Sequence, residues 1–433
     1  MCGIRRWHTA WLVELHAAKD MRRDPQLPRV VLTQFSLGHG GTGRVALHLA
    51  NGLSEQADVH LIVTMRGGVG QQALESIDVP KVNVHYLLQR KPASRILGQI
   101  MAVPALVRKL RALRPDVVVA AGNNSALATA SAFLLAFGRR KGLYIKVTNP
   151  LIRPHDRRLA VAIRKLDYSR VFSLASGVLA LSDAECSVLR TLFPSLAGRF
   201  NTVANPYVTP EMLARANVAA SARAGAPLVI AVGRLHFQKR FDLLLRAWER
   251  VSCPGARLCI IGEGPDRAAL EALVTELGIG NRVEMPGYST DVAGWLAKAD
   301  AFVLSSDFEG LPAVVLEAMA FNCPVVSTDC FPAARELVGN AEQCHVVPRG
   351  DVGGLAARID QVLAGRSRPT KLRQIAERYS VAAGVESHRA ALGLAACNLT
   401  DCREPFRTSC SSSSSLPTPA NRECGPARVP RHG

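Results

Sequence analysis

Short apolar runs alternate with helical patterns along most of the chain. In the first half the apolar runs lie at residues 30–35, 59–64, 82–87, 117–121, 143–147, 177–181 and 202–204, and a helical pattern at 44–54 separates the first two. Runs of this length, rich in Val, Ile and Leu, are typical of parallel strands that are buried on both faces. We therefore predict an α/β fold with a doubly wound parallel sheet.

A second series of apolar runs follows at residues 228–232, 258–261, 283–285, 301–304, 325–327 and 344–347. An alanine-rich stretch without strand pattern separates the two series, and a long helical pattern at 371–394 closes the second. With 433 residues the chain can form two cores. We predict an N-terminal extension at 1–28, a first Rossmann-like domain at 29–207, a linker at 208–227, a second domain at 228–384, the end of the closing helix at 385–397 and a disordered Ser- and Pro-rich tail at 398–433.

The stretch 306–320 places two glutamates eight positions apart where a strand gives way to a helix. Gly310 frees the backbone there, and Pro312 suits the first helical position because its missing N–H would be an orphan anyway. Free amides at a helix start favour anions. Glu309 would lie at the mouth of this anion site and Glu317 about a turn and a half into the helix, which favours a ligand with phosphate and sugar hydroxyls.

A second cationic motif follows the apolar run at 228–232. Gly233 allows a sharp turn, and Arg234 and Lys239 are spaced so that both can close on one diphosphate. Cations stabilise the negative charge that grows on a departing diphosphate. Gly262 and Gly287 end the next two runs, and the order of these motifs is more informative than any one of them.

These motifs resemble the E-x7-E signature and donor loops of the retaining glycosyltransferases of family 4, over residues 30 to about 395. The resemblance implies the GT-B fold, in which two facing Rossmann-like domains are joined by a C-terminal helix that crosses back to the first. It also implies a nucleotide diphosphate sugar as co-substrate, with no further cofactor. Its implied catalytic residues are Glu309, Arg234 and Lys239, and its implied donor-binding residues are Gly40, Gly41, Gly233, Gly262, Gly287, Gly310, Leu311 and, on the ribose, Glu317.

The stretch 38–43 reads G-x-G-x-x-G, which taken alone favours a dinucleotide-binding loop. Arg66 after the second run could accept a 2′-phosphate, so an NADP-dependent oxidoreductase is an alternative. The resemblance instead implies that the backbone of Gly40 and Gly41 approaches the donor phosphates. A nucleotide-sugar epimerase or a binding protein on the same scaffold is a second alternative.

The acceptor side follows the family less closely. Many members have a histidine just after the strand equivalent to 143–147, whereas this chain has Asn149 there and His155 as its nearest histidine. Both are candidate acceptor-side residues. No D-x-D motif is present, so we expect no metal, and Arg234 and Lys239 would replace a divalent cation.

Charge adds a candidate partner. The net charge is +18, and residues 1–207 hold 28 Lys and Arg against 12 Asp and Glu. Basic residues at 91, 95, 108, 109, 111 and 114 flank the apolar stretch 96–107, which favours docking on an anionic membrane surface. The acceptor would then be a glycan or a lipid-linked sugar. Aromatic residues do not interleave with these cations, so we expect no nucleic acid.

The cysteine pattern and the apolar runs indicate a compartment. The eleven cysteines contain no C-x-x-C pair, and no apolar run has the length of a membrane span. Glu14 and His16 interrupt the N-terminal apolar stretch too early for a signal peptide. We therefore expect a cytoplasmic protein that is peripheral at the membrane face.

Overall fold

The structure is a computed structural model that describes residues 27–37, 41–65, 81–88, 94–218, 225–365 and 369–394. The residues up to Cys397 belong to one compact unit. The predicted extension at 1–28, the predicted tail at 398–433, Gly40 and Arg66 lie outside the described residues or at their edge. The domain boundaries given above stay predictions, because the two sheets described next belong to that single unit.

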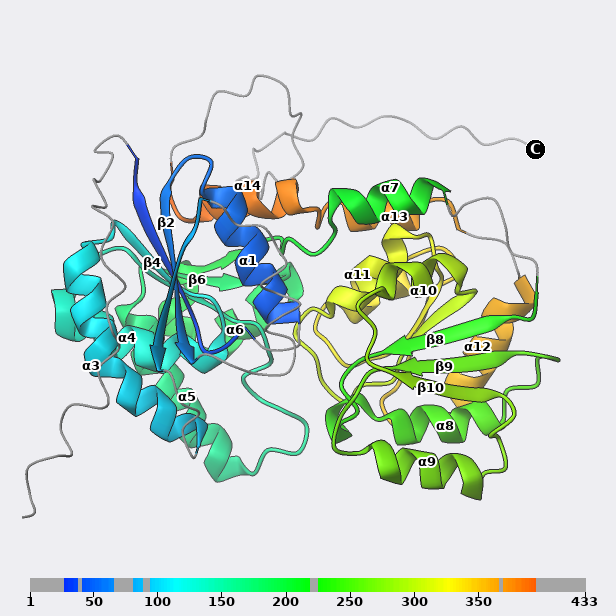
Figure 1. Ribbon diagram of the computed structural model, residues 1–433. Coiled ribbons are helices and arrows are strands. Elements are labelled where there is room, and N and C mark those ends of the chain that lie inside the picture. Colours follow the sequence, from blue (N-terminus) through cyan, green and yellow to red (C-terminus); the bar gives the residue numbers. More distant parts are fainter. Residues whose placement is uncertain are drawn as a thin grey trace, which may run out of the picture. The chain divides into compact units, whose positions relative to one another are not determined.

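The first sheet has seven parallel strands in the order β3-β2-β1-β4-β5-β6-β7 (Figure 1). The order reverses direction beside β1, as in a doubly wound sheet. The strands are β1 (Arg29–Gln34), β2 (Asp58–Met65), β3 (Asn83–Leu88), β4 (Val117–Ala120), β5 (Leu143–Lys146), β6 (Gly177–Ala180) and β7 (Phe200–Thr202).

Successive residues of these strands point to opposite faces of the sheet and pack in different cores. Val30 and Leu32 of β1 are buried in the core that also contains Val45 of α1, whereas Val31 lies in the core formed with α3 to α6. Both faces are therefore covered, which explains why the strands read as continuous apolar runs. The helices are α1 (Gly41–Leu53), α3 (Arg95–Leu113), α4 (Asn123–Phe137), α5 (Arg158–Leu174) and α6 (Asp183–Leu192).

The second sheet has six strands in the order β10-β9-β8-β11-β12-β13. Its strands are β8 (Leu228–Val232), β9 (Arg257–Ile261), β10 (Val283–Gly287), β11 (Ala301–Leu304), β12 (Val325–Thr328) and β13 (His345–Val347). Its helices are α8 (Phe241–Glu249), α9 (Arg267–Glu276), α10 (Val292–Lys298), α11 (Ala313–Ala320) and α12 (Val352–Gly365), with α7 (Pro210–Val218) packed on α10 and α11. Both predicted series of strands are thus present.

The end of the described chain returns to the first sheet. After α13 (Leu372–Glu377), which packs on α11, helix α14 (Val381–Ala391) packs against α1. The approach is close, because a Cβ added at Gly52 of α1 would lie 2.2 Å from Cγ2 of Val385. The C-terminal segment therefore crosses back onto the first domain, as predicted.

Some element boundaries differ from the predictions. The single closing helix at 371–394 is two helices, because a turn intervenes and Ser380 caps the second one by accepting a hydrogen bond from the amide of Ala383 at 3.3 Å. The stretch 208–227, predicted as a linker, contains α7. Pro312 is the N-cap of α11 rather than its first helical residue.

Lys146 is a buried cation at the end of β5. Its side chain is 1% exposed, and its Nζ has no hydrogen-bond partner among the described residues. Burial lowers the pKa of Lys146 to about 7. Lys146 lies near α14. Burial is the largest cause that lowers the pKa of His388 on that helix, and the charge of Lys146 is the second. Holding this side chain charged therefore opposes folding.

We expect Lys146→Met to raise the melting temperature near neutral pH. The folded state of the natural chain binds fewer protons than the unfolded state between the folded pKa of about 7 and the ordinary value of 10.5. Its stability therefore rises with pH across that window, and the substitution removes this rise. The advantage of the variant, on the order of a few kcal/mol from the size of the shift, should be largest below pH 7 and shrink towards pH 10.

Thermal unfolding of both proteins from pH 6 to pH 10 measures this difference. Lys141→Met, at an exposed position just before β5, is the matched control and should leave the profile unchanged. A Lys146→Met variant that is less stable than the natural chain at every pH would show that the ammonium has a stabilising partner.

Candidate active site

Three glycine-containing loops of the second sheet lie side by side where strands β8, β9 and β10 end. The amide of Gly233 donates to the carbonyl of Ile261 at 3.0 Å, and the amide of Gly262 donates to the carbonyl of Gly287 at 2.8 Å. Gly262 has a φ of 151°, and a Cβ there would lie 1.9 Å from the carbonyl oxygen of Gly233. Only glycine fits this approach. The predicted donor-side glycines are therefore neighbours.

Lys239, in the loop after β8, forms an ion pair with Glu309, in the loop between β11 and α11. Lys239 Nζ lies 2.8 Å from Glu309 Oε1, and Ser306 Oγ donates to the same oxygen at 2.9 Å. The side chain of Glu309 is 11% exposed, so the pair is largely shielded from water. Arg234 is exposed, and it has no ion-pair partner within the part of the chain that the structure describes. It is therefore available to an incoming anion.

The loop after β8 is joined to the loop after β11 by hydrogen bonds. Gln238 Nε2 donates to the carbonyl of Phe308 at 2.8 Å, and the amide of Asp307 donates to the carbonyl of Gln238 at 2.9 Å. Arg240, which stands where the resembled family commonly has glycine, has a φ of 49° and pairs with Asp307 at 3.2 Å. These contacts fix Lys239 relative to Glu309.

Glu317 is buried on α11 and bound by an arginine from the first domain. Its side chain is 1% exposed, and Arg44 Nη2 donates to its Oε1 at 2.7 Å. Glu317 Oε2 has no partner among the described residues. No motif in the sequence points to Arg44, although it lies within the helical pattern after the glycine-rich stretch. One oxygen of Glu317 is thus held in place, and the other is buried without a hydrogen-bond partner among the described residues.

Gly41, a described residue of the glycine-rich stretch, also approaches α11. A Cβ added at Gly41 would lie 3.6 Å from Cβ of Ala313, the first residue of α11. The start of α1 therefore contacts the start of α11. Gly40 lies outside the described residues, and so does Arg66, on which the NADP alternative depended.

The loop after β5 touches the loop that carries Glu309. A Cβ added at Gly310 would lie 2.1 Å from the carbonyl oxygen of Thr148. Asn123, at the start of α4, holds that segment, because its Oδ1 accepts from the amide of Thr148 at 2.7 Å and its Nδ2 donates to the carbonyl of Asn149 at 3.0 Å. The sequence analysis did not find Asn123, which has no motif around it.

The two candidate acceptor residues lie on this same segment. Asn149 is held through its backbone, whereas His155 is exposed and its Nε2 lies 3.8 Å from Asp307 Oδ2. Nearby, the guanidinium of Arg153 lies over the ring of Phe308, 5.1 Å from its centroid. The segment 148–155 is therefore positioned beside the Glu309 loop, where an acceptor could approach.

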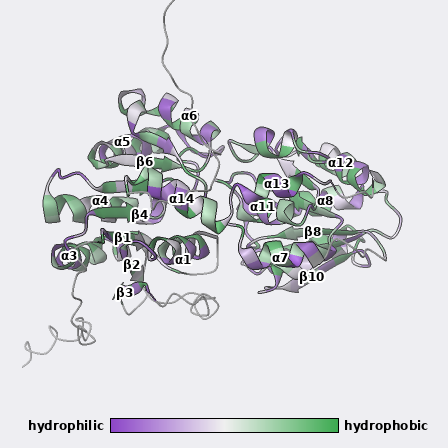
Figure 2. Cartoon of the chain, turned by 90° about the horizontal axis from the view of Figure 1, so that it is seen from above, coloured by the Kyte–Doolittle hydropathy of each residue, from purple (hydrophilic) through white to green (hydrophobic). Residues whose placement is uncertain are grey.

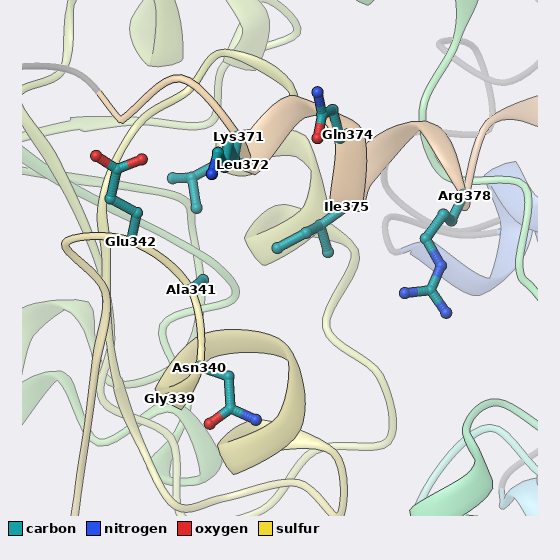
Figure 3. A pocket seen from close by; sticks show the side chains of 9 residues that line it. All are labelled: Gly339, Asn340, Ala341, Glu342, Lys371, Leu372, Gln374, Ile375 and Arg378. Atoms are coloured by element: carbon teal, nitrogen blue, oxygen red, sulfur yellow. The ribbon is translucent and has the colours of Figure 1, made fainter.

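A separate hollow of about 600 Å³ lies beside α13 (Figure 3). Lys371, Gln374 and Arg378 line it from the α13 side, and Asn340 and Glu342 line it from the loop after the π-helical turn at Arg335–Gly339. None of its lining residues belongs to the loops described above, so it is not part of the site.

Comparison with known protein families identifies the class. Residues 39–211 match the model described as Glycosyltransferase Family 4, and residues 216–379 match the model described as Glycosyl transferases group 1. Together the two models cover most of the chain and both sheets. The chain belongs to this family of glycosyltransferases, which decides against the oxidoreductase alternative.

Curated relatives of this chain include bacterial glycosyltransferases. A lipopolysaccharide core biosynthesis glycosyltransferase of Rhizobium meliloti, LpsE, is 38% identical over 34% of this chain and 43% of its own length. An N-acetylgalactosaminyltransferase of Campylobacter jejuni, whose printed name gives a diphospho-undecaprenol substrate, is 28% identical over 71% of this chain and 82% of its own length. The first of these matches thus spans less than half of the relative.

Solved structures share the fold. HepE of Anabaena, solved with UDP and glucose, gives a TM-score of 0.67 at 20% identity over 84% of this chain and 99% of its own. WaaG, a glycosyltransferase of lipopolysaccharide biosynthesis, gives 0.62 at 15% identity over 84% and 98%. The predicted GT-B class is confirmed.

We expect Gly310→Ala to disrupt the site, because its Cβ would meet a backbone oxygen that cannot rotate away. Forcing the two loops apart should cost about 1–3 kcal/mol of stability. Thermal unfolding measures the loss. Gly365→Ala, at the end of α12 where a Cβ meets nothing within 4 Å, is the control and should change stability by less than about 1 kcal/mol. Equal melting temperatures for the two variants would contradict the close approach.

Proposed function

We propose that this glycosyltransferase moves a sugar from a nucleotide diphosphate sugar, UDP- or GDP-linked, to a glycan or lipid-linked acceptor with retention of anomeric configuration. The observation that carries the proposal is the meeting of Lys239, Glu309, Arg44 and Glu317 around the start of α11. The names of the relatives support a role in the synthesis of a surface polysaccharide or lipopolysaccharide.

The cations and amides account for diphosphate binding. Arg234 is exposed, Lys239 is held beside Glu309, and the loop at Gly310 and Leu311 leads into α11. The first amides of a helix have no intrahelical acceptor, so they favour an anion. These groups would stabilise the charge on the leaving diphosphate. They would take the place of a divalent cation, and we propose a reaction independent of metal.

The two glutamates would bind the sugars of the donor. Glu309 would hold hydroxyls of the transferred sugar and support its oxocarbenium-like centre. The free oxygen of Glu317 would accept a ribose hydroxyl, while Arg44 fixes the other oxygen. These roles follow the family resemblance, and the burial of both carboxylates supports them.

The reaction we propose is a displacement on one face of the sugar. The bond between the anomeric carbon and the diphosphate oxygen breaks, the acceptor oxygen bonds to that carbon from the same face, and the acceptor proton passes to the departing diphosphate. Retaining glycosidases place a second carboxylate as nucleophile. Glu309 is already paired with Lys239. Trapping a covalent sugar adduct on the enzyme would overturn this mechanism.

We expect UDP or GDP to raise the melting temperature of the chain, and the Arg234→Ala/Lys239→Ala double variant to lose that shift. A ligand that binds only the folded state at 100 times its dissociation constant stabilises by about 2.7 kcal/mol. Removing both cations should weaken binding at least tenfold, because charged hydrogen bonds contribute about 1.5–3 kcal/mol each. Thermal shift with UDP, GDP, ADP and NADPH identifies the nucleotide.

Arg246→Ala is the control for this experiment, because Arg246 is an exposed cation on α8 outside the strand-end loops. It should keep the shift. Stabilisation by NADPH alone would overturn the proposal. Conversion of the nucleotide sugar without any acceptor would instead support the epimerase alternative.

Exposed apolar side chains gather on three neighbouring helices of the first domain. Helices α3, α4 and α5 lie next to one another on one face of the sheet (Figure 2). Ten of the exposed large apolar residues belong to them: Ile96, Leu97, Ile100 and Met101 on α3, Leu127, Leu134 and Leu135 on α4, and Leu159, Ile163 and Leu166 on α5. We call these residues the apolar surface. Clusters of exposed apolar side chains mark interaction sites on soluble proteins.

Cations border the apolar surface. Arg108 and Arg111 are exposed on α3, Arg157 and Arg158 are exposed at the start of α5, and Lys165 is exposed near the middle of α5. An apolar stripe with flanking cations matches an anionic lipid surface. Helix α5 begins directly after the segment 148–155 beside the Glu309 loop, so a docked membrane would present a lipid-linked acceptor there. None of the described helices is both long and apolar enough to cross a membrane.

We expect the chain to sediment with vesicles of phosphatidylglycerol and phosphatidylcholine, and not with phosphatidylcholine alone. The Leu159→Ser/Ile163→Ser/Leu166→Ser variant should bind at least tenfold more weakly, because each exposed apolar side chain contributes more than about 1 kcal/mol when buried in lipid. Salt at 0.5 M should also weaken binding, since exposed charges are then screened.

Val188→Ser is the matched control, because Val188 is an exposed apolar residue of α6 outside the apolar surface. It should bind as the natural chain does. If the natural chain is instead a dimer in light scattering and the triple variant is a monomer, the apolar surface contacts a second copy and the membrane proposal is wrong.

A further inference from the structure

Two segments connect the first sheet to the second, and backbone hydrogen bonds join them. The outgoing segment follows β7, and the returning segment precedes α14. The amides of Tyr207 and Val208 both donate to the carbonyl of Tyr379 at 3.0 Å, and the amide of Val381 donates to the carbonyl of Val208 at 2.9 Å. We call these paired segments the double connection. These hydrogen bonds hold the outgoing and the returning segment together between the two sheets.

The side chain of Tyr207 extends from the double connection to the loop at Gly310 and Leu311, which we call the donor loop. Its hydroxyl accepts from Asn205 Nδ2 at 2.7 Å and donates to the carbonyl of Leu311 at 2.8 Å. The directions are fixed, because an amide NH₂ can only donate and a carbonyl can only accept. Burial raises the pKa of Tyr207, so the hydroxyl keeps the proton that it donates.

The position of the Leu311 carbonyl affects the backbone that leads into α11. Leu311 lies between Gly310, which packs against the carbonyl of Thr148, and Pro312, the N-cap of α11. A fixed carbonyl at Leu311 sets the orientation of the peptide units before the helix, and with it the direction of the amides that face an anion. Tyr207 and Asn205 are both buried, so water does not readily replace this bond.

We propose that Tyr207 is a positioning residue that couples the double connection to the donor loop at Gly310 and Leu311. This inference rests on the proposed function, in which that loop binds the diphosphate. It assigns a role to the stretch 205–207, which reads Asn-Pro-Tyr. Tyr207 acts through the loop and touches no reacting atom.

The test is Tyr207→Phe, which removes only the hydroxyl. We expect the dissociation constant of the bound nucleoside diphosphate, UDP or GDP, to rise about fivefold, the effect of losing one neutral hydrogen bond. The KM for the donor should rise with it, while the KM for the acceptor stays unchanged. Isothermal titration and donor-dependent kinetics measure these quantities.

Tyr379→Phe is the matched control. Tyr379 is a buried tyrosine of the returning segment, and the carbonyl that it contributes to the double connection remains in the variant. It should bind the nucleotide as the natural chain does. Asn205→Ala, which removes the donor to the Tyr207 hydroxyl, should raise the dissociation constant about twofold to threefold and provides a second variant if Tyr207→Phe fails to fold.

The outcomes separate the two proposals. If the natural chain binds neither UDP nor GDP, the proposed function fails. If it binds one of them and both Tyr207→Phe and Asn205→Ala bind it equally well, the function stands and the positioning role is wrong. Equal losses in Tyr207→Phe and Tyr379→Phe would also overturn that role, because they would show that the effect does not depend on the hydroxyl that bonds the Leu311 carbonyl.

Discussion

The close approach between the carbonyl oxygen of Thr148 and the backbone of Gly310 is the constraint on which the site depends. A backbone-to-backbone contact leaves no side chain that could move aside, so both loops must keep their course. Asn123 fixes one side of the contact through three hydrogen bonds from the segment at 148–149 to its Oδ1. On the other side, Tyr207 fixes Leu311. The Glu309 loop is therefore held from two directions by elements of the first half of the chain.

Charge is balanced within the site before any ligand arrives. Glu317 pairs with Arg44, Glu309 with Lys239, and Asp307 with Arg240. A buried carboxylate without a cation would be strongly destabilising, so these pairs are needed for folding as well as chemistry. In the proposed function a diphosphate would share Lys239 with Glu309, whereas Arg234 has no ion-pair partner among the residues that the structure describes. Arg234 would therefore meet the diphosphate first and Lys239 would complete its binding.

Much of this arrangement follows from the sequence. The family resemblance assigns the glycines and cations after β8, β9, β10 and β11 to one donor site, and they lie together because the carboxyl ends of parallel strands meet at one edge of a sheet. The breaks in the apolar pattern gave both strand series. The partners of these residues were not predictable in the same way. Arg44 and Glu317 are 273 positions apart, and Tyr207 and Leu311 are 104 apart, so no local pattern links them.

The turn between α13 and α14 shows a different limit of sequence reasoning. The helical pattern runs through residues 378–380 without a proline or glycine, and the break depends on the cap that Ser380 gives to α14 and on the bonds that Tyr379 accepts from the outgoing segment. Ser380 directly precedes α14, and a serine at an N-cap position is a readable signal, but the second contact exists only in the folded chain. Tertiary pairing thus decides that the chain turns here, and the same pairing places the Tyr207 hydroxyl against the donor loop. The double connection therefore explains both the turn between α13 and α14 and the position of the Tyr207 hydroxyl against the Leu311 carbonyl.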